Sequence, residues 1–227
     1  MILPDALFSP PIAHRGLWTS GEVAENSLTA FERACQAGYG LEFDVRLSSD
    51  GEAMVFHDDS LERMTGETGS VETATAAELI RLSLQSGDDR IPSLAETLRL
   101  VDGRAMLLVE IKAGPYGATQ LAARTAELLG HYHGPAAAIS FDAEALAWLK
   151  ARRPRIARGL DATGAEQPDG AAKMELACET ADPHFLVLEL ASAAAPAARR
   201  LRAEGRPVIA WTVRSPEDAA RVSAISR

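Results

Sequence analysis

Short apolar runs alternate with amphipathic stretches along nearly the whole chain, and this alternation limits the possible folds more than any other feature. Apolar runs typical of strands occupy residues 11–14, 39–47, 53–57, 105–112, 136–141, 156–160, 185–190 and 208–213. Amphipathic stretches typical of helices begin near residue 28 and cover about 117–130, 143–151 and 196–204, with a last one after Ser215. Strands that alternate with helices favour a parallel sheet covered by helices.

Local signals mark where several of these helices begin. Thr75 and Ser93 are each followed three residues later by a glutamate, which is the spacing of a capping box. Asn26 or Ser27 can cap the helix that begins near residue 28, and Gly38 follows its end.

The composition of the predicted strands narrows the fold class. The runs at 106–109 and 185–188 are apolar throughout, as a sheet buried on both faces requires. No glycine-rich phosphate loop follows the first strand, so a dinucleotide-binding Rossmann fold is disfavoured. A length of 227 residues suits a single domain. We therefore predict an α/β protein with one TIM-like (β/α) barrel, in which functional side chains lie at the C-terminal ends of the strands.

The charge balance excludes one class of partner. The chain has 32 acidic and 23 basic residues and a net charge of −9, which disfavours nucleic acid. An anionic small molecule would need a local cationic site. We find neither a basic segment followed by a long apolar run at the start of the sequence nor a span of about 20 apolar residues. We therefore expect a cytoplasmic protein without stable membrane insertion.

Charged side chains interrupt the apolar strands near their C-terminal ends. Residues two apart on a strand point to the same face, so Glu42 and Asp44 should lie together, as should Glu110 and Lys112. Buried carboxylates are rare unless they are paired or bind metal. The sequence therefore predicts that Glu42, Asp44 and Glu110 bind one divalent cation, with Mg²⁺ or Ca²⁺ favoured by the all-oxygen ligands.

Two histidines and an arginine complete this set. His14 and His57 each end a predicted strand beside a charged neighbour, and histidine can exchange a proton near neutral pH. Strict alternation turns Arg15 away from His14, but Gly16 predicts that the strand ends there and that the backbone turns. Arg15 and Lys112 then supply the cationic site that an anionic substrate needs.

These residues form an ordered set of motifs. The set, which runs from about residue 11 to 213, is His14-Arg15-Gly16, Glu25-Asn26-Ser27, Glu42-Phe43-Asp44-Val45, Asp50-Gly51, His57-Asp58, Ile91-Pro92-Ser93-Leu94, Glu110-Ile111-Lys112, Ser140-Phe141 and Trp211-Thr212-Val213. Each motif alone is weak, but their order and spacing are specific. The chain resembles the glycerophosphodiester phosphodiesterases.

The resemblance implies a role for each site residue. Glu42, Asp44 and Glu110 would bind the metal, His14 and His57 would be the acid and base, and Arg15 and Lys112 would hold the phosphate. Phe141 and Trp211 would flank the glycerol or alcohol, and Asn26 would support the site. It also implies a small insertion after the second strand, here about 48–90, and hydrolysis of a small glycerophosphodiester to glycerol 3-phosphate and an alcohol.

Two alternatives remain open from the sequence. One is a related barrel phosphodiesterase that acts on lysophospholipids, although the short insertion offers little material for an apolar groove. The other is a catalytically silent barrel protein that only binds a ligand, which need not retain both histidines and all three acids. The leaving alcohol, the physiological metal and the oligomeric state are not determined by the sequence.

The number of strands gives one further expectation. With 53–57 assigned to the excursion after the second strand, seven barrel strands lie near residues 12, 41, 106, 137, 157, 186 and 209. A barrel of eight strands that lacks one has two unpaired edges. We therefore expect either a further strand beyond Arg227 in the natural protein or coverage of the gap by another segment, such as residues 1–8 or a neighbouring chain.

Overall fold

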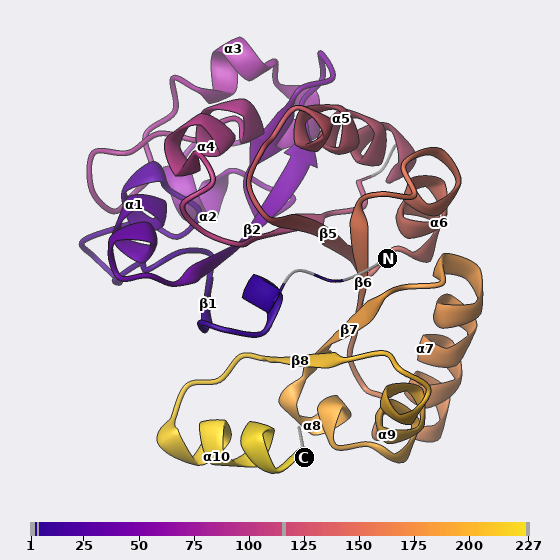
Figure 1. Cartoon of the computed structure of the whole chain (residues 1–227). Helices are drawn as coiled ribbons and strands as arrows, with labels where there is room; N and C mark the ends of the chain where they lie inside the picture. Colours follow the sequence, from indigo (N-terminus) through magenta and orange to yellow (C-terminus); the bar gives the residue numbers. More distant parts are fainter. Residues whose placement is uncertain (1–2, 4, 115–116, 226–227) are drawn as a thin grey trace. The chain divides into compact units, whose positions relative to one another are not determined.

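The chain forms two compact units, Met1–Ala138 and Ile139–Arg227. The computed structural model describes residues 3, 5–114 and 117–225 (Figure 1). The expectation of a single domain over residues 1–227 stays a prediction.

The first unit is built on three parallel strands, β1 (Ile12–His14), β2 (Gly40–Leu47) and β4 (Leu107–Ile111). β1 and β4 each pair in parallel with β2. The unit also contains the 3-10 helices η1 (Asp5–Leu7) and η2 (Val71–Thr73), and the helices α1 (Leu28–Gln36), α2 (Glu62–Thr65), α3 (Ala76–Leu79), α4 (Leu94–Val101) and α5 (Thr119–Gly130). The short strand β3 (Ala53–Val55) pairs antiparallel with the end of β2.

Helix α1 begins as the sequence predicts and fixes the orientation of β2. Its N-cap is Ser27, whose hydroxyl accepts a hydrogen bond from the backbone N–H of Ala30. Phe31 of α1 packs against Phe43 of β2 with ring centroids 5.3 Å apart, and both rings are buried. Because Phe43 faces the helix, alternation directs Glu42 and Asp44 to the opposite face of the strand. Capping boxes also open α3 at Thr75 and α4 at Ser93, as predicted.

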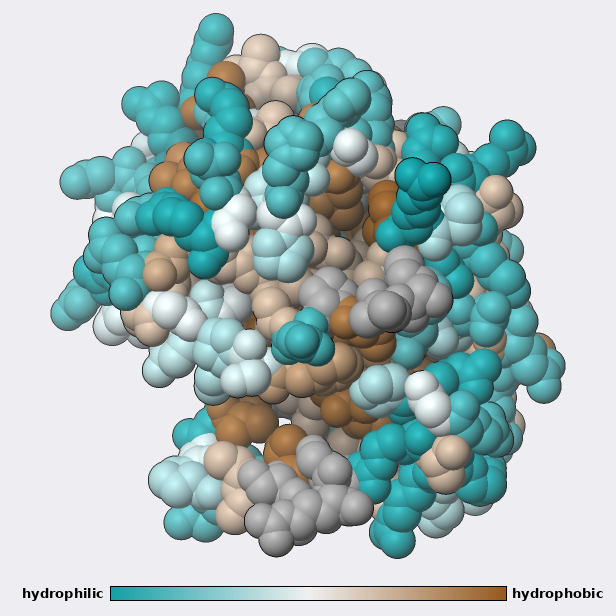
Figure 2. Space-filling view, in the orientation of Figure 1, coloured by the Kyte–Doolittle hydropathy of each residue, from teal (hydrophilic) through white to brown (hydrophobic). Residues whose placement is uncertain are grey.

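The segment 48–90, which we predicted as an insertion, packs around a small apolar core that it shares with Ala24 and Ile91. This core consists of Ala24, Met54, Phe56, Leu61, Val71, Leu79, Leu84 and Ile91. Residues from β3, η2 and α3 are thereby packed together, so the segment is an ordered part of the first unit. On the face of this unit that Figure 2 shows, hydrophilic residues are spread over the surface, with hydrophobic residues visible between them.

The second unit contains three parallel strands in the order β6 (Ala157–Ala162), β7 (Phe185–Glu189) and β8 (Val208–Trp211). Its helices are α6 (Ala143–Arg152), α7 (Pro168–Ala181), α8 (Leu190–Ala193), α9 (Pro196–Ala203) and α10 (Pro216–Ile225). Strand β5 (Ala136–Ser140) contains the boundary between the units.

Helix α7 is absent from the sequence prediction. It begins with a proline at the first turn, contains Gly170, and buries only Met174, Cys178 and Ala181. Glycine near its start and a narrow buried face leave the periodic apolar signal weak. Burial of those three residues in the second unit stabilises the helix despite its weak local signal.

Strands lie at all seven positions predicted for the barrel. An eighth strand stays a prediction. The alternative that another segment, such as residues 1–8, covers the gap also stays a prediction; Asp5–Leu7 form a 3-10 helix, and residues 1, 2 and 4 lie outside the described residues. In the part of the chain that the structure describes, no helix is both long and apolar enough to cross a membrane.

Close packing in the second unit generates a test of the fold. A Cβ atom at Gly159 of β6 would lie 2.3 Å from Cε2 of the buried Phe185 and 2.9 Å from Cγ2 of Ile139. Gly159→Ala should therefore destabilise the protein by about 1–3 kcal/mol, since overpacking forces shifts in the core. Thermal unfolding would show this as a fall in melting temperature of roughly 2–4 °C per kcal/mol.

The matched control is Gly130→Ala at the end of α5, where no heavy atom lies within 4 Å of the added Cβ. Its melting temperature should equal or exceed that of the wild type, because alanine favours a helix over glycine. Equal melting temperatures for the two variants would contradict the packing described for β6.

Candidate active site

Three buried carboxylates from β2 and β4 converge. The parallel register places Glu110 beside Asp44, and it places His14 of β1 beside Glu42. Each of the three acids is at most 7% exposed. Each offers a ligand oxygen, and these three oxygens all lie within 4.8 Å of one another. The structure thus brings together the three acids that the sequence singled out.

Two cations contact this cluster. The Nζ atom of Lys112 lies 3.0 Å from Oδ1 of Asp44 and 2.6 Å from Oε1 of Glu110. The Nε atom of Arg15 lies 3.3 Å from Oδ2 of Asp44. Burial acts against ionisation of Asp44, but the charges of Lys112 and Arg15 outweigh it and lower its pKa to about 2. Burial and then the negative charge of Asp44 raise the pKa of Glu110 to about 7.

The cluster fits a hard divalent cation. All of its ligand atoms are carboxylate oxygens, which Mg²⁺ and Ca²⁺ prefer. Burial and then the negative charge of Asp44 raise the pKa of Glu110, and a bound divalent ion would offset both effects. Within the described residues this is the only group of three histidine, cysteine or acidic side chains that could hold a metal ion.

A left-handed turn directs Arg15 into the cluster. Arg15 has φ 59° and Gly16 has φ 82°, so the backbone turns where the sequence predicts. A Cβ at Gly16 would lie 2.8 Å from Cβ of Ala30, so only glycine allows α1 to approach this closely. The guanidinium of Arg15 donates from its NH1 atom to Oε1 of Glu25 at 2.9 Å. This residue therefore reaches the carboxylates, although alternation along β1 points it away.

Asn26 supports Asp44 directly. Its Nδ2 atom donates to Oδ2 of Asp44 at 2.8 Å, and the backbone N–H of Asp44 donates to Oδ1 of Asn26 at 3.4 Å. Asn26 has φ 56° and is buried. The alternative that Asn26 caps α1 is therefore wrong, because Ser27 is the cap and the Asn26 side chain holds Asp44.

His57 lies just beyond β3 and is paired with its neighbour. Its Nδ1 atom is 2.6 Å from Oδ1 of Asp58. Hydrogen bonds from Arg63 outweigh the effect of burial and lower the pKa of Asp58 to about 2, so this carboxylate can only accept. The proton of the neutral ring is thereby assigned to Nδ1, and Nε2 is left as the acceptor.

His14 lies beside the carboxylates of β2. Its Nε2 atom is 3.8 Å from Oε2 of Glu42. Burial and then the charge of Arg15 lower the pKa of His14 to about 4. At neutral pH His14 is therefore an uncharged imidazole.

Sequence reasoning missed the residues that connect Arg15 with His57. The buried Glu25 accepts from Arg15 and also from the NH2 atom of Arg63 at 2.6 Å, and Arg63 in turn donates to Asp58. Glu25 belongs to the motif Glu25-Asn26-Ser27, and this motif could have indicated its place in the site. Arg63 belongs to α2 and has no comparable signal in the sequence.

The two aromatic residues predicted to flank the alcohol lie in the second unit. Phe141 follows β5 and Trp211 ends β8. Their ring centroids are 6.2 Å apart and their planes are nearly perpendicular at 88°. Phe141 is 46% exposed, so this pair offers an aromatic surface. Its role in substrate binding stays a prediction.

Comparison with known proteins identifies the family. The model of the glycerophosphoryl diester phosphodiesterase family matches residues 14–226. The chain belongs to this family. A glycerophosphodiester phosphodiesterase of Caldanaerobacter subterraneus is 39% identical over 111 residues, which cover 45% of this chain and 45% of the relative. One of Bacillus altitudinis is 36% identical over 129 residues, which cover 53% of this chain and 52% of the relative. The matches thus span about half the length of these curated relatives.

Solved structures of glycerophosphodiester phosphodiesterases and of a related phosphodiesterase share the fold. An Oleispira antarctica phosphodiesterase in complex with the product sn-glycerol-3-phosphate is 29% identical, with a TM-score of 0.84 over 96% of this chain and 91% of that one. A Thermotoga maritima glycerophosphodiester phosphodiesterase is 26% identical, with a TM-score of 0.75 over 94% and 90%. The TIM-like barrel class predicted from the sequence is thereby confirmed.

The close approach of the buried carboxyl groups of Glu42, Asp44 and Glu110 predicts how the stability of the protein depends on pH. The folded pKa of Glu110 lies above its ordinary value of 4.5, so the folded state binds this proton more tightly than the unfolded state. Its contribution to stability is present below the unfolded pKa and is lost as pH rises through about 7. In chelator, raising the pH from about 6 to about 8 should lower the melting temperature of the wild type more than that of Glu110→Gln.

Glu22→Gln serves as the control, because Glu22 is an exposed glutamate of the same unit. Its pH profile should follow that of the wild type. If Glu110→Gln also followed it, Glu110 would lack the raised pKa that burial and the charge of Asp44 give it.

Proposed function

We propose that this chain hydrolyses glycerophosphodiesters to glycerol 3-phosphate and an alcohol, with Mg²⁺ or Ca²⁺ held by Glu42, Asp44 and Glu110. The observation that carries the proposal is the convergence of three buried carboxylates within 4.8 Å of one another in a chain of this family. The bound product of the Oleispira antarctica protein supports glycerol 3-phosphate as the product.

Arg15 and Lys112 are the proposed phosphate ligands. Both cations already contact the acids, and together they place two positive charges beside the three carboxyl groups. The planar guanidinium of Arg15 can donate two hydrogen bonds to a phosphate, whereas Lys112 contributes a single charge. When bound, the divalent ion would supply the remaining charge needed to stabilise the phosphate as it is attacked.

His14 is suited to be the base and His57 the acid. Burial and Arg15 lower the pKa of His14, so the imidazole can take the proton of the attacking hydroxyl as its oxygen bonds to phosphorus. The phosphorus–oxygen bond to the alcohol then breaks. His57, whose Nδ1 atom lies 2.6 Å from Oδ1 of Asp58, gives a proton from Nε2 to the leaving oxygen. The attacking hydroxyl is water or a hydroxyl of the substrate; in the second case a cyclic phosphate forms first and water opens it.

Metal dependence is the first test of this function. Glycerophosphocholine hydrolysis, followed by release of glycerol 3-phosphate, should stop in excess chelator and return with Mg²⁺ or Ca²⁺. Glu42→Gln, Asp44→Asn and Glu110→Gln should each weaken cation binding by about tenfold or more in calorimetry, since each removes a charged ligand. Full activity in chelator would contradict the proposed metal.

The same assay separates the two alternatives that the sequence leaves open. Turnover of a lysophospholipid but not of glycerophosphocholine would favour the lysophospholipid enzyme. Binding of glycerol 3-phosphate without any turnover would favour the silent binding protein.

Replacement of the histidines is the second test. His14→Ala and His57→Ala should each lower kcat by at least about 10²-fold, the scale of general acid–base catalysis, and leave the melting temperature near that of the wild type. His184→Ala is a matched control, because His184 belongs to the second unit and its ring accepts a backbone N–H from Arg158. An unchanged kcat in the His14→Ala or His57→Ala variant would contradict the acid–base role proposed for the replaced histidine.

A further inference from the structure

A buried arginine joins β2 to the segment that carries His57. Arg46 lies two residues beyond Asp44 on β2 and is 6% exposed. Its Nε atom donates to the backbone carbonyl of His57 at 2.8 Å, and its NH1 atom donates to Oε1 of Glu72 at 2.8 Å. Its NH2 atom lies 2.5 Å from the exposed carboxylate of Asp59. All three nitrogens of the guanidinium therefore contact acceptors in the segment 57–72.

Stability alone does not account for this arrangement. Desolvation of a buried ion pair can exceed its Coulomb energy, and apolar residues of similar size often replace such pairs without loss. The pair of Arg46 and Glu72 does provide something that an apolar pair lacks, which is a donor aimed at a backbone carbonyl. β3 ends at Val55, so the carbonyl of His57 lies beyond the strand ladder, and Arg46 supplies its donor.

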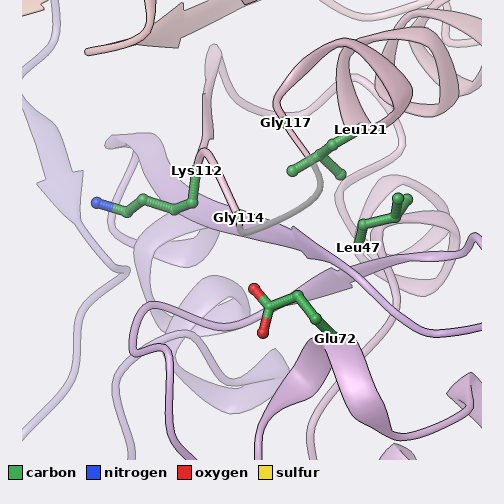
Figure 3. Close-up of a pocket in the computed structure, with 6 residues that line it drawn as sticks. All are labelled: Leu47, Glu72, Lys112, Gly114, Gly117 and Leu121. Atoms are coloured by element: carbon green, nitrogen blue, oxygen red, sulfur yellow. The ribbon is translucent and has the colours of Figure 1, made fainter.

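Glu72 is itself firmly placed. It belongs to η2, which has a capping box between Ser70 and Thr73, and its neighbour Val71 is fully buried in the apolar core of the insertion. A Cβ at Gly114 would lie 3.2 Å from Oε1 of Glu72, so the chain after β4 approaches the carboxylate closely. Figure 3 shows this carboxylate in a pocket, with Lys112 extending away from it; the lining residues are Leu47, Glu72, Lys112, Gly114, Gly117 and Leu121.

We propose that Arg46, held by Glu72, is a positioning residue that fixes the backbone at His57 and thereby the imidazole used in catalysis. The inference rests on the proposed function of His57 as the acid. It also assigns a role to the insertion, whose apolar core anchors Glu72 and so anchors the arginine. Asp59 has no such role, because its carboxylate is 88% exposed and solvent screens its attraction to Arg46.

The decisive variant removes both charges together. Arg46→Met should destabilise the protein, because it leaves the carboxylate of Glu72 buried without its cation. Arg46→Met with Glu72→Met should recover much of the melting temperature but keep kcat at least about tenfold below wild type, with KM nearly unchanged, since small misplacement of a catalytic group is costly. Asp59→Ala is the control and should keep kcat near that of the wild type. Wild-type kcat in the double variant would overturn the proposal.

A cycle with His57→Ala tests whether the effect passes through that histidine. In the His57→Ala background, the double replacement at 46 and 72 should cost no further kcat. An undiminished tenfold loss there would overturn the proposed route and leave Arg46 with another role.

Scalar couplings of the His57 side chain provide a readout that does not depend on activity. They should report one χ1 rotamer in the wild type and averaging in the double variant. Unchanged couplings would overturn the positioning role. A wild type that hydrolyses no glycerophosphodiester would instead refute the proposed function, and the couplings would still decide whether Arg46 positions the ring.

Discussion

The fully buried carboxylate of Asp44 sets the main constraint on the first unit. A charge without solvent needs compensation from its surroundings, and Asp44 receives it from three separate segments: the turn after β1, the loop before α1 and the end of β4. Arg15, Asn26 and Lys112 therefore have to arrive at the same place. The left-handed conformations of Arg15 and Asn26 follow from this requirement, because only a turned backbone brings those side chains to the acid.

Parallel strand pairing does the rest of the positioning. In register, β1 and β4 place His14 beside Glu42 and Glu110 beside Asp44, so a strand period of two is enough to gather acids from two strands. Phe43 lies between the two acids of β2, and its side chain packs against Phe31 of α1. The same strand thus serves packing and chemistry on opposite faces, and Gly16 allows α1 to come close enough for both.

This division explains which features the sequence can predict. Alternation along β2 and β4 is local, so the shared face of Glu42 and Asp44 follows from spacing alone, and the strand positions follow from apolar runs. Arg63 and Glu25 meet across 38 positions, and no local pattern records a contact between distant loops. Local sequence does not decide between Asn26 and Ser27 as the cap, because the deciding interaction is with Asp44, 18 residues away. The sequence does not predict helix α7, because few of its residues are buried and its periodic apolar pattern is therefore weak.

The segment 48–90, which we predicted as an insertion, carries residues of the candidate site. The strands and the turn after β1 provide the acids, the cations and His14, whereas the segment 48–90 provides His57, Asp58 and Arg63. The proton transfer that we propose for His57 requires contacts that hold this segment in place against the strands. Backbone pairing ties it through β3 as far as Val55. Beyond that point the guanidinium of Arg46 continues the connection at His57, so two parts of the site meet at one buried side chain of β2.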